Sequence, residues 1–183
     1  MLPSPYDLAW PPRRIVVHWT AGGAHASQND RKHYHYLIDQ TGEIVEGFPA
    51  LAANCANLQG RPSWSHDHQD GYAAHTRRFN SWSMGVSLCG MLGAVEGVDL
   101  GPYPLVPLQA HALVGLLAAA CEQYGLWPTE HRVMTHEEVQ RLHGVQQPGK
   151  WDVRWLDTDT HGTVTGDACG PWIRKRVMGV MPI

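Results

Sequence analysis

The stretch RRIVVHWTAGG, residues 13–23, decides which fold this chain is expected to adopt. A run of β-branched residues bounded by glycine is typical of a buried strand, so we predict a strand over residues 14–20. His18 then lies at the carboxyl end of that strand, where the ligands of α/β sheets usually gather. A histidine at such a position is either hydrogen-bonded in the core or a ligand, and its partners elsewhere in the chain decide between the two.

Those partners come from residues 132–156, which read RVMTHEEVQRLHGVQQPGKWDVRWL. We predict a short strand over residues 133–135 that delivers His136, followed by a polar loop. Lys150 and Asp152 are two residues apart, so in an extended chain their side chains leave on the same side. Imidazole nitrogen and carboxylate oxygen are ordinary zinc ligands, and a catalytic zinc takes three protein ligands. The pattern therefore predicts a metal site formed by His18, His136 and Asp152.

The rest of the chain has the pattern of a single α/β domain with a central mixed β-sheet flanked by helices. Strands are predicted at residues 33–39 and 43–47, as a hairpin, and a central strand is predicted at residues 84–91. The clearest helix runs over residues 107–124, because proline stands at its first position and Gly125 follows its end. Its apolar face should cover the sheet. We expect the metal site at one edge of this sheet, in a surface groove.

The composition is that of one folded domain without a marked attraction to nucleic acid or membrane. The chain has 183 residues, 43% of them hydrophobic, and a formal net charge of −3, which allows one core and does not indicate nucleic-acid binding. The N-terminal residues lack the apolar segment of a secretory signal peptide, and no run is long and apolar enough to insert stably into a membrane. The cysteines show no metal or disulfide spacing, so we predict free thiols at Cys55, Cys89, Cys121 and Cys169.

Four sequence blocks follow one another along the chain: VVHWTAGG at 16–23, YHYLIDQTGEIVEG at 34–47, HTRRFNSWSMGVSLCGM at 75–91, and THEEV…PGKWD at 135–152. Together and in this order they resemble the zinc-dependent N-acetylmuramoyl-L-alanine amidases of type 2. That family includes phage endolysins and is related to peptidoglycan recognition proteins. The resemblance implies a catalytic domain over residues 13–156, an N-terminal lead-in over residues 1–12 and a C-terminal extension over residues 157–183.

The resemblance also implies roles for individual residues. One Zn²⁺ per chain would be bound by His18, His136 and Asp152, and Lys150 matches the family's catalytic lysine. Tyr34 matches a tyrosine that some phage members place beside the zinc water. The residues expected to bind substrate are Thr20, His75 and Asn80.

One departure from the family pattern leaves the general base open. Some members carry a catalytic Glu in the strand that corresponds to residues 84–90, whereas this chain has Ser87 and Cys89 there and no carboxylate. Two candidates for the base therefore remain, Tyr34 and the metal-activated water itself.

The activity that the resemblance implies is hydrolysis of the amide between N-acetylmuramic acid and the L-alanine of the stem peptide, with peptidoglycan as the partner. We expect a monomer that is made in the cytoplasm and acts on the cell wall after release. A non-catalytic peptidoglycan-binding module is one alternative, but recognition-type relatives have lost the third metal ligand, and this chain keeps Asp152 and Lys150. A zinc peptidase acting on the cross-linking peptide is another alternative, against which the order of the four blocks argues.

Overall fold

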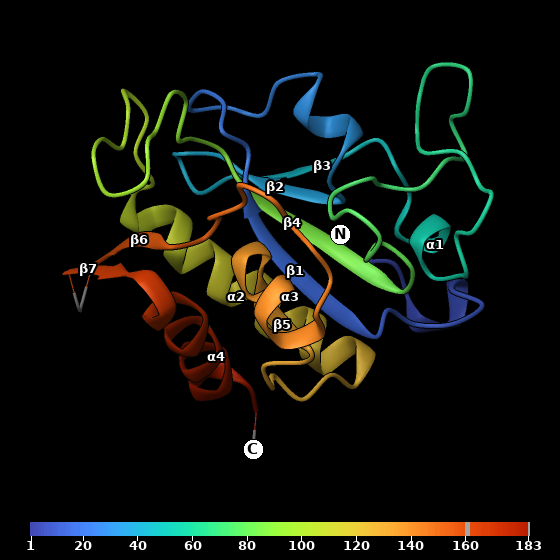
Figure 1. Cartoon of the computed structure of the whole chain (residues 1–183). Coiled ribbons are helices and arrows are strands. Elements are labelled where there is room, and N and C mark those ends of the chain that lie inside the picture. The colour runs from blue at the N-terminus through green and yellow to red at the C-terminus, as the bar shows by residue number, and fades with distance from the viewer. Residues whose placement is uncertain (160–161, 183) are drawn as a thin grey trace.

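A five-stranded mixed sheet forms the centre of the protein, as the computed structural model of residues 1–159 and 162–182 shows (Figure 1). The strand order is β3-β2-β4-β1-β5. Strands β2, β4, β1 and β5 run parallel, and β3 pairs antiparallel with β2. The bounds are β1 Arg14–Trp19, β2 Tyr36–Ile38, β3 Ile44–Glu46, β4 Ser83–Leu88 and β5 Val133–Thr135. The predicted α/β class and mixed sheet are confirmed.

One face of the sheet is covered by the long helix α2, Pro107–Tyr124. Alternate residues of β1, among them Ile15 and Val17, are fully buried in the same core as the apolar side of α2. The helix ends where Gly125 takes a left-handed conformation with φ of 64°, which glycine adopts without steric penalty. The predicted bounds of this helix and its position over the sheet are therefore confirmed.

The opposite face of the sheet carries the functional side chains. Val16 of β1 and Met134 of β5 are buried there together with Val139 of helix α3, His136–His143. Because side chains alternate along a strand, His18 leaves β1 on the same face as Val16. The strand thus places an imidazole at its carboxyl end, beside the first turn of α3.

Two local predictions were wrong. His136 does not enter a polar loop but begins α3, because the Thr135 hydroxyl accepts a hydrogen bond from the backbone N–H of Glu138 while the Glu138 carboxylate accepts one from that of Thr135. This reciprocal capping box is a strong helix-start signal that the sequence TXXE carries. The strand predicted over residues 33–39 is shorter, since only Tyr36–Ile38 adopts strand structure.

The C-terminal residues are part of the compact structure. A second, two-stranded sheet is made by β6, Trp155–Thr158, and β7, Gly162–Thr165, and helix α4, Cys169–Val180, follows it. Helix α4 packs beside α2 and contacts β5 (Figure 1). The shorter elements are α1 Leu51–Asn54 and the 3-10 turns η1 Pro5–Asp7, η2 Asp30–Lys32 and η3 Gly166–Ala168. Among the described residues, no helix combines the length and the apolarity needed to span a membrane.

Candidate metal centre

Three potential metal ligands converge at the carboxyl ends of β1 and β5. His18 is the penultimate residue of β1, His136 begins α3, and Asp152 lies in the loop that precedes β6. The ligand atoms of these residues all lie within 4.8 Å of one another, and all three side chains are buried. His18 and His136 are separated by 118 residues in sequence, so only the parallel pairing of β1 with β5 brings their rings together.

The spacing of these atoms suits a single tetrahedral ion. The Nδ1 atoms of His18 and His136 are 3.0 Å apart, and Asp152 Oδ2 lies 3.1 Å and 2.9 Å from them. Zinc bonds of about 2.0–2.1 Å would separate the ligand atoms of a tetrahedral site by about 3.3 Å, so a small shift of the side chains would accommodate the ion. Two imidazole nitrogens and a carboxylate oxygen at such short range also repel one another unless a cation or a proton lies between them.

The far side of the His136 ring fixes which nitrogen faces the centre. His136 Nε2 lies 3.1 Å from Gln147 Oε1, an oxygen that can only accept. Gln147 in turn donates from its amide nitrogen to the backbone oxygen of Arg77 at 2.9 Å, which fixes the orientation of the amide. The proton of His136 is therefore held on Nε2, and Nδ1 presents a lone pair to the metal site.

His18 is held in the same way by a second histidine. His75 Nε2 lies 3.3 Å from the backbone oxygen of Ser83, to which it can only donate, so His75 Nδ1 accepts. The atom facing it at 3.1 Å is His18 Nε2, which must carry the proton. His18 therefore also turns an unprotonated Nδ1 to the centre. Such outer partners orient ligand rings and usually matter for metal affinity.

The charge states of the cluster agree with this arrangement. Burial, together with the nearby His136, lowers the pKa of His18 to about 4, so the ring is neutral at ordinary pH. Burial opposes ionisation of Asp152, but the adjacent His136 and His18 rings outweigh it and lower the pKa of the carboxyl well below its usual range. A neutral His18 imidazole and an ionised Asp152 carboxylate are protonation states that a divalent cation requires of its ligands.

His75 was predicted to line the substrate groove, and contact with a substrate remains a prediction for it. Its side chain is buried behind His18, away from the surface, where it contacts Thr76 Oγ1 and His18 as well as Ser83. It fits there because Gly85 of β4 has no side chain: a Cβ at that position would lie 2.6 Å from the His75 ring. The contact of His75 with His18 Nε2 places it where it can orient the His18 ring.

We expect Gly85→Ala to disturb the metal site through His75. The added methyl group overlaps a buried ring, and such overpacking typically costs about 1–3 kcal/mol. Urea denaturation would measure the stability, and chelator competition would measure the zinc affinity, which should fall as well. A matched control is Gly115→Ala in α2, where a Cβ meets nothing within 4 Å and should stabilise the helix by roughly 0.5–1 kcal/mol. Equal behaviour of the two variants would contradict the packing role of Gly85.

Asn80 and Thr20 hold loops near the centre. Asn80 Oδ1 accepts a hydrogen bond from the backbone N–H of Thr76, which closes the turn after His75. Thr20 Oγ1 accepts hydrogen bonds from the backbone N–H groups of Gly22 and Gly90 and joins the ends of two parallel strands. Both side chains are half-buried, so contact with a substrate remains a prediction for them.

Lys150 and Tyr34 both lie beside the metal ligands. Lys150 is exposed, and its charge is close enough to His18 to contribute to lowering the pKa of that ring. The Tyr34 ring centre is 5.2 Å from that of His18. Burial raises the pKa of Tyr34, and the carboxylate of Asp152 adds to the effect. The Ser87 hydroxyl lies near the Tyr34 phenol without meeting it in hydrogen-bond geometry.

Sequence reasoning missed the residues that hold the ligands in place. Gln147 gave no signal because a glutamine in a polar loop is common, and its partner Arg77 lies 70 residues away. Glu138 did carry a signal, the capping box with Thr135, which was overlooked. Its buried ion pair with Arg174 of α4 could not be read from the sequence, since the two residues are 36 positions apart.

The free state predicted for the cysteines is confirmed. All four thiols are buried and unpaired with one another, and burial raises the pKa of Cys89 to about 12. A thiol in that state is protonated and is a poor metal ligand. Among the described residues, the metal-ligand cluster contains no cysteine.

Residues 9–152 match the sequence profile of the N-acetylmuramoyl-L-alanine amidase family. The match includes all three candidate metal ligands and covers more than half of the chain. The fold and the buried His-His-Asp cluster define an amidase-like α/β protein with a candidate metal centre. The chain belongs to the N-acetylmuramoyl-L-alanine amidase family.

Solved structures of similar fold include endolysins and peptidoglycan recognition proteins. The Ph2119 endolysin from a Thermus scotoductus bacteriophage is 20% identical, with a TM-score of 0.42 over 70% of this chain and 73% of that chain. The amidase LysC from Clostridium intestinale is 17% identical, with a TM-score of 0.45 over 77% and 78%. Drosophila peptidoglycan recognition protein SD is 22% identical, with a TM-score of 0.44 over 72% and 73%. No curated protein sequence matches the chain significantly.

Proposed function

We propose that this protein is a zinc-dependent peptidoglycan hydrolase of the endolysin type, which cleaves the amide between N-acetylmuramic acid and the L-alanine of the stem peptide. The observation that carries the proposal is the convergence of two imidazole Nδ1 atoms and one carboxylate oxygen within 4.8 Å. Membership of the amidase family supports the choice of an amide as the bond that is cleaved. The cell wall is then the place where the protein acts.

The residues of the centre fit zinc, and their number is that of a catalytic zinc site. His18, His136 and Asp152 would hold the ion, and Gln147 and His75 would keep the two rings in the required tautomer. When bound, zinc activates water as a nucleophile near neutral pH and polarises the scissile carbonyl. Three protein ligands are the number found in catalytic zinc sites, whereas structural sites usually have four.

Two further side chains act on the reacting groups in this proposal. Lys150 donates to the oxyanion that develops on the scissile carbonyl, where a fixed positive charge stabilises the transition state. Tyr34 keeps its proton at neutral pH, because burial raises the pKa of its phenol. That protonation state suits Tyr34 as a hydrogen-bond donor near the leaving amine better than as the general base.

We expect Lys150→Ala to lower kcat by about a hundredfold or more, as the loss of other oxyanion donors does. Lys150 is exposed, so stability should change by at most about 0.5 kcal/mol. Zinc content should remain, because Lys150 is not a ligand. Lys150→Arg keeps the charge with a different shape, so only partial rescue is expected.

The measurement is steady-state kinetics on a soluble muramoyl-peptide, with zinc determined in the same samples. The matched control is Lys175→Ala, an exposed lysine of α4 that lies outside the metal centre. A Lys150→Ala enzyme with full zinc and the wild-type rate would remove Lys150 from the mechanism.

Mass spectrometry of digested peptidoglycan tests the proposed reaction itself. An amidase releases intact stem peptides with a free L-alanine amino terminus and leaves glycan strands without peptides. New termini inside the stem or the cross-link would identify a peptidase instead. Binding to peptidoglycan without any cleavage by the zinc-loaded protein would identify a recognition module.

A further inference from the structure

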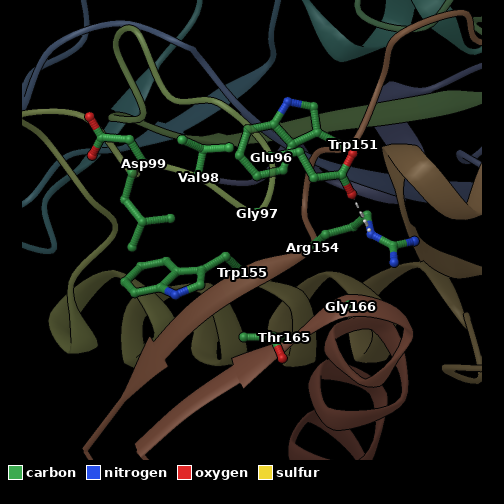
Figure 2. A pocket seen from close by; sticks show the side chains of 10 residues that line it. Glu96, Gly97, Val98, Asp99, Trp151, Arg154, Trp155, Thr165 and Gly166 are labelled. Atoms are coloured by element: carbon green, nitrogen blue, oxygen red, sulfur yellow. Dashed lines mark ion pairs between the residues drawn. The ribbon is translucent and has the colours of Figure 1, made fainter.

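A cavity of about 550 Å³ lies beside the metal centre, on the side of the C-terminal sheet. Its walls come from the loop over residues 96–100 and from the β6–β7 hairpin (Figure 2). Trp151, Trp155 and Val98 all border it (Figure 2). Much of this wall, including Trp155 and Thr165, follows the last residue matched by the amidase family.

The cavity is connected to the candidate metal centre through Trp151, and none of the three candidate ligands lines it. Trp151 precedes the ligand Asp152, and its ring packs edge to face on Trp19 of β1 at 4.5 Å. Trp151 also lines a second depression, which contains Lys150. A substrate has one part on each side of its scissile bond. When that bond reaches the metal centre, one of these two parts, or arms, can therefore extend over Trp151 into the cavity.

Fixed acidic groups determine what kind of arm the cavity suits. Glu96 and Asp99 line it, and its cation, Arg154, is engaged by carboxylates: Glu96 at 3.0 Å, Asp167 at 2.8 Å and Glu137 at 3.3 Å. Four carboxylates therefore lie in or beside the cavity with a single guanidinium, and the excess negative charge repels an anionic ligand. Indole faces beside carboxylate acceptors instead suit a neutral ligand with apolar C–H faces and many hydroxyl groups.

We infer that this cavity is a subsite for a neutral sugar unit of the glycan strand, with Trp155 as its stacking platform. The inference rests on the proposed function, because that reaction joins a glycan arm to a peptide arm at the scissile amide. The peptide arm carries carboxylates, and it is directed away from the acidic cavity. The cations Arg77 and Arg78 are exposed and do not line the cavity, and Gln147 donates to the backbone oxygen of Arg77.

The test uses a peptide-free N-acetylglucosamine tetrasaccharide as the probe and titration calorimetry as the measurement. We expect wild type to bind it and Trp155→Ala to bind at least tenfold more weakly. Trp155 is partly buried against the core, so Trp155→Ala alone could lose affinity through misfolding. Thr165→Tyr avoids this difficulty, because Thr165 is an exposed strand residue directly opposite Trp155, and a tyrosine there would fill the cavity while suiting a strand.

Trp127→Ala is the matched control, since it removes an exposed indole outside the cavity and should leave binding unchanged. His136→Ala should also still bind the tetrasaccharide, which separates this subsite from the proposed reaction. If peptidoglycan is not cleaved but the tetrasaccharide binds in a Trp155- and Thr165-dependent way, the subsite stands and the proposed amidase activity fails. If the enzyme cleaves but wild type does not bind the probe, or if Trp155→Ala and Thr165→Tyr bind it like wild type, the subsite is refuted. Competition for the cavity by a sugar-free stem peptide would refute it too.

Discussion

His136→Ala is expected to reduce bound zinc from about one ion per chain to nearly none and to abolish peptidoglycan hydrolysis. The substitution removes one of three converging ligands, and the two that remain cannot complete a catalytic zinc site. Changes to outer partners of zinc ligands already cost about 10–100-fold, so the loss of a ligand should exceed a hundredfold. Elemental analysis of the purified protein, with turnover measured in parallel, checks both effects.

Two companion variants make this result specific. Gln147→Leu removes no metal ligand, but it removes the acceptor of the His136 Nε2 proton and the donor to the Arg77 backbone oxygen. Its zinc affinity should therefore fall by about 10–100-fold without being lost. His66→Ala removes an exposed loop histidine and should match wild type in both measurements. A His136→Ala protein that keeps full zinc and full activity would exclude the assigned ligand set.

Arg174→Met is expected to destabilise the folded protein by about 3 kcal/mol, within the range for breaking a buried ion pair. Arg174 of α4 donates two hydrogen bonds to the Glu138 carboxylate, at 2.8 Å and 3.0 Å. Glu138 is 1% exposed, so without Arg174 its charge is left buried with the half-exposed Arg141 as its remaining cation. For a chain of this size the midpoint of thermal unfolding should fall by roughly 6–12 °C.

The double variant Glu138→Gln/Arg174→Met separates the lost charge pairing from lost packing. Glutamine can still accept the hydrogen bond of the capping box, and no buried charge remains, so most of the stability should return. Lys175→Met, at the neighbouring exposed position of α4, should unfold like wild type. If the double variant is as unstable as Arg174→Met, the loss arises from packing of the arginine stem and not from the uncompensated carboxylate. Thermal unfolding followed by calorimetry gives all four values.

The sequence alone determined the elements that local chemistry specifies. A β-branched run ending before glycines predicted β1, and proline and glycine at its two ends predicted α2. The three candidate metal ligands were predicted because histidine and aspartate are ordinary zinc ligands and lie in blocks that resemble one family. These signals are short-range, so they can be read without knowing the fold.

The tertiary structure decided everything that depends on residues distant in sequence. It placed His75 behind His18, because Gly85 leaves space for the ring and Ser83 accepts its proton. It also joined the C-terminal helix to the helix that begins with His136, through Arg174 and Glu138. Parallel strands connect segments far apart in the chain, and contacts between side chains from different strands and helices follow from the packed fold and not from local patterns.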